Sequence, residues 1–263
     1  MAESTLTLVR DDFRTEIAQF LGYGVTLASL TTAQSDLVDR LVGAGLRQFY
    51  YPPPMAPTDA PHEWTFLHGA SFVLNLTADR GDYDLPDDCA SVVGDLTYID
   101  TQARMPIKLV GLGAIREERS GIYLSSTAPP NKVAIVPKSR DGTQGQRWQA
   151  LFSPVPDASY SVRGCYQVEP HSLTSTRTLP YGGPTHSETI KASCLAMAEE
   201  YMDGERGVMY ALFLERLRAS VAKDVKRNRP ESFGYNGDGG RARQPLADNS
   251  YVRYNGQYSN ESS

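Results

Sequence analysis

Near the start of the chain, apolar residues recur every three or four positions, which is the spacing of an amphipathic helix. The first such segment covers residues 10–21 and ends at Gly22. The second has Thr31 or Thr32 as its N-cap and ends near Phe49, before three consecutive prolines. The pattern therefore predicts two helices in the first 50 or so residues.

From residue 63 the pattern changes to short segments rich in Val, Ile, Thr, Tyr and Phe, separated by turn sequences. Several short strands at this spacing are typical of an antiparallel sandwich or barrel. One short helix is expected around residues 115–119. The expected strands are residues 64–67, 70–76, 90–98, 107–110, 121–125, 132–136, 147–152 and 160–168.

Helical spacing returns after Gly182-Gly183-Pro184. Thr185 and Glu188 have the spacing of a capping box, and the helix that they open should reach about Tyr201. Asp203-Gly204 interrupts it, and a last helix should end near Arg229, before Pro230.

These patterns predict an α+β fold with four parts. Residues 1–62 and 184–229 should form one helical body, because both ends of the chain carry amphipathic helices. Residues 63–183 are then a β-rich, sandwich- or barrel-like insertion, and residues 230–263 an extended C-terminal arm. The arm is too poor in aliphatic residues to form its own core.

Apolar side chains are nevertheless scattered through the C-terminal arm. A plain linker does not need them, whereas a segment that becomes ordered on a partner does, because aromatic anchors supply much of the binding energy. The candidate contact residues are Phe233, Tyr235, Leu246, Tyr251, Tyr254 and Tyr258.

The composition of the 263 residues is ordinary for a globular protein, with 40% apolar and 22% charged residues. A net charge of −5 argues against a general nucleic-acid binder and against a peripheral membrane protein. We expect no signal peptide and no membrane span. Cys89, Cys165 and Cys194 are few and far apart, so we expect reduced, mostly buried thiols.

We find no recognisable catalytic or metal-binding pattern and expect no cofactor. Gly111-Leu112-Gly113 lacks the third glycine of a dinucleotide-binding loop, and a turn or bulge is the expected structure. The four histidines lack metal-ligand spacing, and His186 should be exposed or near a helix cap. Four carboxylates gather between Asp82 and Asp88, where a turn with aspartates capping backbone donors is favoured over a cation site.

Basic residues crowd the end of the last predicted helix. They complement the helix dipole and form a solvated face, or they contact an acidic partner or passing DNA. The candidate interface or channel residues are Arg216, Lys223, Lys226, Arg227 and Arg229.

Four segments together resemble the head-to-tail adaptor proteins of tailed bacteriophages, the group that includes tail tubular protein A. The first runs from the second helix into Phe49-Tyr50-Tyr51-Pro52, and the second is Glu63-Trp64-Thr65-Phe66-Leu67. The third leads from Asp82-Tyr83-Asp84-Leu85-Pro86 into Val93-Gly94-Asp95, and the fourth is Gly183-Pro184-Thr185-His186 opening a late helix. Their order and spacing over about residues 31–230 carry the resemblance.

The resemblance implies a virion structural protein, assembled in the host cytoplasm, that forms a ring of twelve copies between the portal and the tail. The C-terminal arm would then contact the portal. A nozzle or tail-tube protein would lie downstream, with a tail fibre as a further candidate partner. DNA would pass through the channel without sequence-specific binding.

Two other functions remain open from the sequence. The β-rich part could be a binding module of a phage tail, for fibre attachment or carbohydrate recognition. However, Trp64 and Trp148, the only tryptophans, are in apolar contexts that favour burial. A hydrolase using the carboxylates between Asp82 and Asp88 is the third hypothesis.

Overall fold

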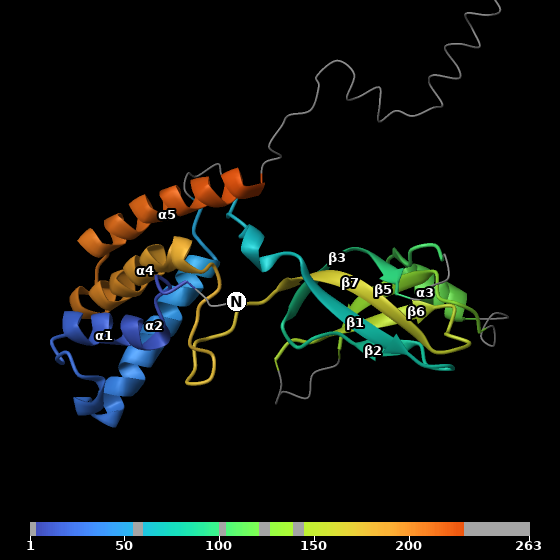
Figure 1. The fold of residues 1–263 in the computed structure, drawn as a ribbon, viewed down its shortest axis with the longest axis horizontal. Coiled ribbons are helices and arrows are strands. Elements are labelled where there is room, and N and C mark those ends of the chain that lie inside the picture. The colour runs from blue at the N-terminus through green and yellow to red at the C-terminus, as the bar shows by residue number, and fades with distance from the viewer. Residues whose placement is uncertain (1–3, 55–59, 100–103, 121–126, 139–144, 229–263) are drawn as a thin grey trace, which may run out of the picture. The chain divides into compact units, whose positions relative to one another are not determined.

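A computed structural model describes residues 4–54, 60–99, 104–120, 127–138 and 145–228 (Figure 1). The chain divides into two compact units, Met1–Asp224 and Val225–Ser263, and only the end of the last helix is described in the second. The predicted C-terminal arm lies outside the described residues. The domain boundaries predicted at residues 62, 183 and 229 remain predictions. In the described part, no helix is long and apolar enough to cross a membrane.

Four long helices share one hydrophobic core, which we call the helical body (Figure 1). They are α1 (Arg10–Phe20), α2 (Thr32–Tyr50), α4 (Pro184–Asp203) and α5 (Val208–Asn228). Short 3-10 helices, η1 (Leu27–Ser29) and η2 (Thr65–Leu67), lie in the connections. Helices from both ends of the chain therefore form one body, as the hydrophobic pattern predicted.

Local sequence sets where α2 begins. The Thr31 side chain accepts a hydrogen bond from the Gln34 amide, and the Gln34 side chain accepts one from the Thr31 amide. This reciprocal pair satisfies two backbone donors that the first turn would otherwise leave unpaired. The predicted N-cap is thus confirmed at Thr31.

The predicted capping box of α4 is wrong. Pro184 is the first residue of α4 and Gly183 is its N-cap, with a φ of 63° that favours glycine. Thr185 therefore lies inside the first turn and cannot act as the cap. Glu188 instead pairs with Lys191 at 3.3 Å and with Arg216 of α5 at 3.0 Å.

Glu199 joins α4 to α5. One oxygen of its buried carboxylate accepts backbone N–H groups from Gly207, Met209 and Tyr210 at 3.1, 2.9 and 3.2 Å. These donors belong to the start of α5, where a negative charge also complements the helix dipole. Between the helices, Gly204 takes the left-handed conformation and ends α4.

The β-rich part has its own hydrophobic core between two sheets. One sheet has the order β1 (Ala70–Leu76), β7 (Tyr160–Val168), β3 (Cys89–Tyr98) and is antiparallel. The other has the order β2 (Asp82–Asp84), β6 (Trp148–Ser153), β5 (Lys132–Pro137), β4 (Lys108–Leu109). Its only parallel pair in the described residues is β4 with β5. An antiparallel bridge between Leu96 and Ile107 connects β3 to the residue before β4.

Alternation along β7 shows how the first sheet is packed. Val162, Gly164, Tyr166 and Val168 are buried, whereas Arg163 and Cys165 are exposed. Alternation with a period of two places one face on the core and the other in solvent. The predicted strand at residues 160–168 is therefore confirmed with its boundaries.

Two predictions in the β-rich region were wrong, and one strand was missed. Residues 64–67 contain η2 and not a strand, and residues 82–84 form the strand β2, which was not predicted. Gly111 is the N-cap of α3 (Leu112–Arg119), so neither a turn nor a bulge occupies this position. The predicted strand at residues 121–125 lies outside the described residues.

Candidate functional site

The carboxylates between Asp82 and Asp88 do not form one site. Asp82 pairs with Arg119 at 2.7 Å, Asp84 with Lys138 at 2.7 Å and Asp87 with Arg147 at 3.1 Å. Asp88 accepts a hydrogen bond from Tyr166. The expected capping of backbone donors is therefore wrong, because these side chains bind other side chains. Among the described residues, no group of three or more potential ligands could hold a metal ion.

His186 lies in the first turn of α4, as the expectation of a position near a helix cap had it, but it is buried and not exposed. Its ring centroid lies 5.2 Å from those of Trp64 and Phe66 and 6.1 Å from that of Phe49. Trp64 is also buried, and its indole N–H donates to the Phe49 carbonyl at 2.8 Å. This aromatic cluster attaches η2 to the helical body and explains why residues 64–67 belong to the helical core.

All three cysteines are free thiols, with Cys89 and Cys194 buried and Cys165 exposed. Burial raises the pKa of Cys194 to about 12, so this thiol stays protonated and unreactive at neutral pH. The prediction that the thiols are mostly buried is confirmed by Cys89 and Cys194.

Asp224 anchors α5 to the segment before β1. It is 2% exposed and accepts hydrogen bonds from the Thr65 hydroxyl at 2.6 Å, the Thr65 amide at 3.0 Å and His62 Nε2 at 2.9 Å. Burial acts to raise the pKa of Asp224, but the hydrogen bonds from Thr65 and His62 outweigh it and lower that pKa.

The predicted basic residues at the end of α5 have different environments. Arg216 donates to the Glu188 carboxylate and carbonyl, so it holds α5 to α4. Lys223, Lys226 and Arg227 are exposed, and none forms an ion pair with another described residue. Arg229 lies outside the described residues.

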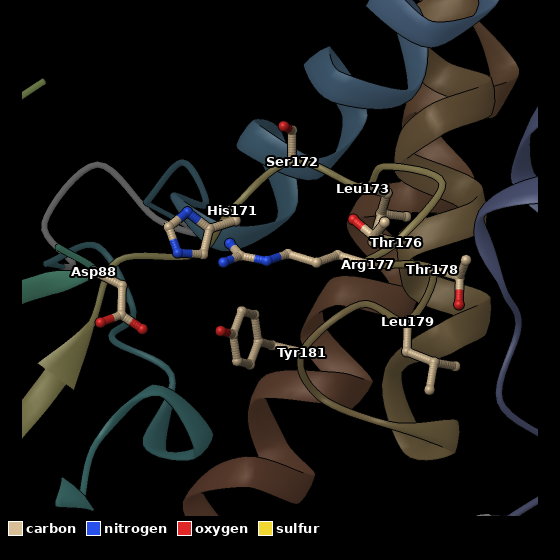
Figure 2. A pocket seen from close by; sticks show the side chains of 9 residues that line it. All are labelled: Asp88, His171, Ser172, Leu173, Thr176, Arg177, Thr178, Leu179 and Tyr181. Atoms are coloured by element: carbon tan, nitrogen blue, oxygen red, sulfur yellow. The ribbon is translucent and has the colours of Figure 1, made fainter. Parts of the chain in front are cut away.

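A pocket of about 440 Å³ lies beside the segment that connects β7 to α4 (Figure 2). Every lining residue except Asp88 comes from this connecting segment, which we define as residues 169–183. The lining residues are Asp88, His171, Ser172, Leu173, Thr176, Arg177, Thr178, Leu179 and Tyr181.

The connecting segment is attached to the helical body at several points. The Tyr50 hydroxyl accepts a hydrogen bond from the Tyr181 amide at 2.9 Å, and the Thr178 carbonyl accepts one from the Arg10 amide at 2.8 Å. Leu173 packs against the helical core. These contacts fix the backbone of the segment that carries most of the pocket.

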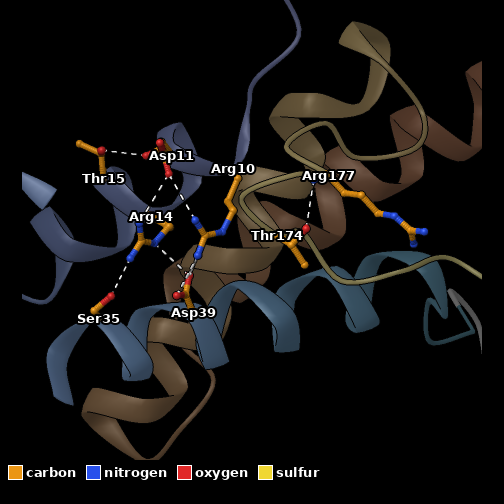
Figure 3. A network of polar contacts seen from close by, with 8 residues as sticks. All are labelled: Arg10, Asp11, Arg14, Thr15, Ser35, Asp39, Thr174 and Arg177. Carbon is orange, nitrogen blue, oxygen red and sulfur yellow. Dashed lines mark hydrogen bonds and ion pairs between the residues drawn. The ribbon is translucent and has the colours of Figure 1, made fainter. Parts of the chain in front are cut away.

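A turn and an ion-pair network support these attachments (Figure 3). The Thr174 hydroxyl accepts the Arg177 amide at 3.0 Å and closes the turn. Arg10, whose amide holds the connecting segment, also makes two hydrogen bonds of 2.9 Å to Asp39 of α2. Arg14 forms an ion pair with the same carboxylate at 2.9 Å. The segment is thus connected through α1 to α2.

Three polar side chains of the pocket are drawn together in Figure 2. Figure 2 shows the Arg177 side chain extending toward His171 and Tyr181. In the described structure, the side chains of these three residues make no hydrogen bond or ion pair. Sequence reasoning missed this pocket. Its signal was a run of hydroxyl residues with one histidine and one arginine, between the last strand and α4.

Comparison with known protein families decides the class of the molecule. Residues 6–235 match the family model described as SU10 adaptor protein. The chain belongs to the SU10 adaptor protein family. No curated protein matches the chain. The protein is therefore a bacteriophage adaptor, a structural component of the virion.

The match to the SU10 adaptor family covers all the described helices and strands, including the pocket. The match does not show whether the chain is of the tail tubular protein A-like type, which the sequence resembled. It ends at residue 235, so Phe233 and Tyr235 are the only candidate arm contacts within it.

Proposed function

We propose that this SU10 adaptor forms a ring between the portal and the tail, with twelve copies as in the adaptors that its sequence resembles. A ring of this kind repeats one heterologous interface until it closes. The helical body would form the ring, and the C-terminal arm, residues 230–263, would contact the portal. The β-rich part would face the nozzle or tail-tube protein, with a tail fibre as a further candidate partner.

The observation that carries this proposal is the end of α5. Asp224 is held by His62 and Thr65, so the helix is fixed to the helical body one turn before it ends. The arm follows this fixed point in the sequence. Because the start of the arm is fixed, the arm loses less conformational entropy when it binds, which favours its proposed contact with the portal.

Charge at the same helix supports a contact with an acidic surface. Lys223, Lys226 and Arg227 are exposed and have no ionic partner among the described residues. Such cations can pair with carboxylates of the portal or with DNA phosphates. The net charge of −5 suits a channel through which DNA slides without binding.

The alternative of a carbohydrate-binding module loses its main support. Exposed tryptophans would mark a sugar site, but Trp64 is 1% exposed and Trp148 is only partly exposed within β6. The ring adaptor is therefore the function that we retain.

Electron microscopy of the purified protein, alone and with its portal, tests the proposal. We expect closed rings that bind the portal, and a chain ending at residue 229 should form rings that bind it weakly. Serine at Tyr251, Tyr254 and Tyr258 should reproduce that loss, while serine at the exposed Tyr201 of α4 serves as the control. A compact monomer that does not bind the portal would refute the proposal.

A further inference from the structure

The pocket beside the connecting segment contains several hydrogen-bond donors that have no partner among the described residues. Arg177 is exposed, and Figure 2 shows its side chain together with those of His171 and Tyr181 at the pocket. Among the described residues, none of these side chains has a hydrogen bond or ion pair. A guanidinium has five N–H donors in a planar fork, which matches the two oxygens of a carboxylate.

The backbone that carries these donors is already ordered. Residues 174 and 177 close a turn on each other, through the hydroxyl-to-amide contact and a second bond from the Thr174 amide to the Arg177 carbonyl at 3.0 Å. Tyr181 is held by Tyr50, and Thr178 by Arg10. Binding at a preorganised site avoids much of the entropic cost of fixing a loop.

Asp88 limits which anion fits. One oxygen of Asp88 accepts the Tyr166 hydroxyl at 3.1 Å, and its backbone carbonyl accepts the Glu169 amide at 2.7 Å. Burial and the hydrogen bond to Asp88 raise the pKa of Tyr166 to about 12, so this hydroxyl remains a donor. The Asp88 carboxylate repels every anion at the pocket, so it disfavours a strand of several phosphates more strongly than a single carboxylate paired with Arg177.

We propose that the pocket binds an acidic side chain, aspartate or glutamate, of a partner polypeptide in the assembled virion, with Arg177 as the main contact. This inference rests on the proposed function, because it assigns a contact of the adaptor with another protein chain. The volume of about 440 Å³ accommodates one side chain and its flanking backbone. Tyr181 and His171 would add hydrogen bonds at the sides of the carboxylate.

Nuclear magnetic resonance of the full chain can test the site with a defined probe. The probe is the blocked tripeptide acetyl-Gly-Glu-Gly-amide, compared with its Gln counterpart and with inorganic phosphate. We expect saturable shifts of the Arg177 side-chain signals with the Glu peptide. Arg177→Gln should weaken this binding about tenfold or more, because a charge-assisted bidentate contact is lost.

The control is Arg163→Gln, which removes an exposed arginine of β7 that does not line the pocket. It should leave peptide binding unchanged. Equal responses to the Glu and Gln peptides, or equal loss in both variants, would overturn the inference. Tighter binding of phosphate than of the Glu peptide would also overturn it and would point to nucleic acid.

Assembly separates this inference from the proposed function. If wild-type rings bind the portal but the Glu peptide does not bind at Arg177, the inference fails and the ring proposal stands. If the peptide binds as expected but the protein never assembles, the ring proposal fails and the pocket remains a carboxylate site.

Discussion

The packing of α2 against α4 makes a sharp prediction about Gly45. A methyl group added at Gly45 would lie 2.6 Å from the Cys194 Cα, 2.7 Å from its Sγ and 2.8 Å from its backbone nitrogen. The Gly45 carbonyl also accepts the Ser193 hydroxyl at 2.8 Å. Because two of the three atoms belong to the backbone of α4, no side-chain rotation can relieve the overlap. The helices must move apart.

The expected cost of Gly45→Ala follows from opposing terms. Overpacking of a core costs about 1–3 kcal/mol, and loss of the Ser193 hydrogen bond adds about 1 kcal/mol. The higher helix propensity of alanine offsets up to about 1 kcal/mol of this destabilisation. We therefore expect the free energy of unfolding to fall by about 2 kcal/mol, a large part of the stability of an ordinary domain.

Gly43, two residues earlier in α2, is a matched control. A methyl group there would meet only the end of the Arg47 side chain, at 3.7 Å. Gly43→Ala should therefore stabilise the protein by about 0.5–1 kcal/mol, through helix propensity alone. Urea unfolding followed by circular dichroism measures both variants. If the free energy of unfolding changes with the same sign and size in Gly45→Ala and Gly43→Ala, the packing of α2 on α4 described above is refuted.

Two carboxylates give further predictions. Glu199→Gln should lower the free energy of unfolding by about 1–2 kcal/mol, because a charged acceptor for Gly207 and the first turn of α5 is lost. Glu205→Gln, at an exposed carboxylate between α4 and α5, should change the free energy of unfolding by less than about 0.5 kcal/mol. Equal losses for the two variants in urea titrations would contradict the capping of α5 by Glu199. The pKa of Asp224 is lowered from its ordinary value of 3.8, so its stabilising effect is complete above that pH and is lost as pH falls through the folded-state pKa. Asp224→Asn should flatten the decline in urea midpoint between about pH 5 and pH 2, and a decline as steep as that of the wild type would contradict this role of Asp224.

The helical body could be predicted largely from periodicity. Phe13 and Ile17 of α1, and Leu41 and Phe49 of α2, repeat at helical spacing, and all four are buried in the structure. Long amphipathic segments with clear end signals, such as the prolines after α2, leave few alternatives. The strands β1 and β7 were predicted with their boundaries for a similar reason, because each alternates over seven or more residues.

Short elements escaped sequence reasoning because long-range contacts decide them. Strand β2 has only three residues and exists because Tyr83 pairs with Ala150 of β6. The composition of residues 64–67 is typical of a strand, but Trp64 packs in the aromatic cluster of the helical body. Burial of His186 depends on the same cluster. No local pattern reports which distant segment will cover a short apolar run.

The way this protein uses its carboxylates bears on its mechanism. A catalytic carboxylate must remain within reach of a substrate, whereas Asp82, Glu199 and Asp224 each connect one secondary-structure element to another. Breaking the contacts of the buried Glu199 and Asp224 leaves polar groups unpaired, so each of these carboxylates resists the relative motion of the elements that it joins. A connector between head and tail needs this resistance more than it needs a reactive group. Among the described residues, Arg177 in the pocket and the lysines near the end of α5 have no ionic partner, and these are the positions where we expect a partner chain to bind.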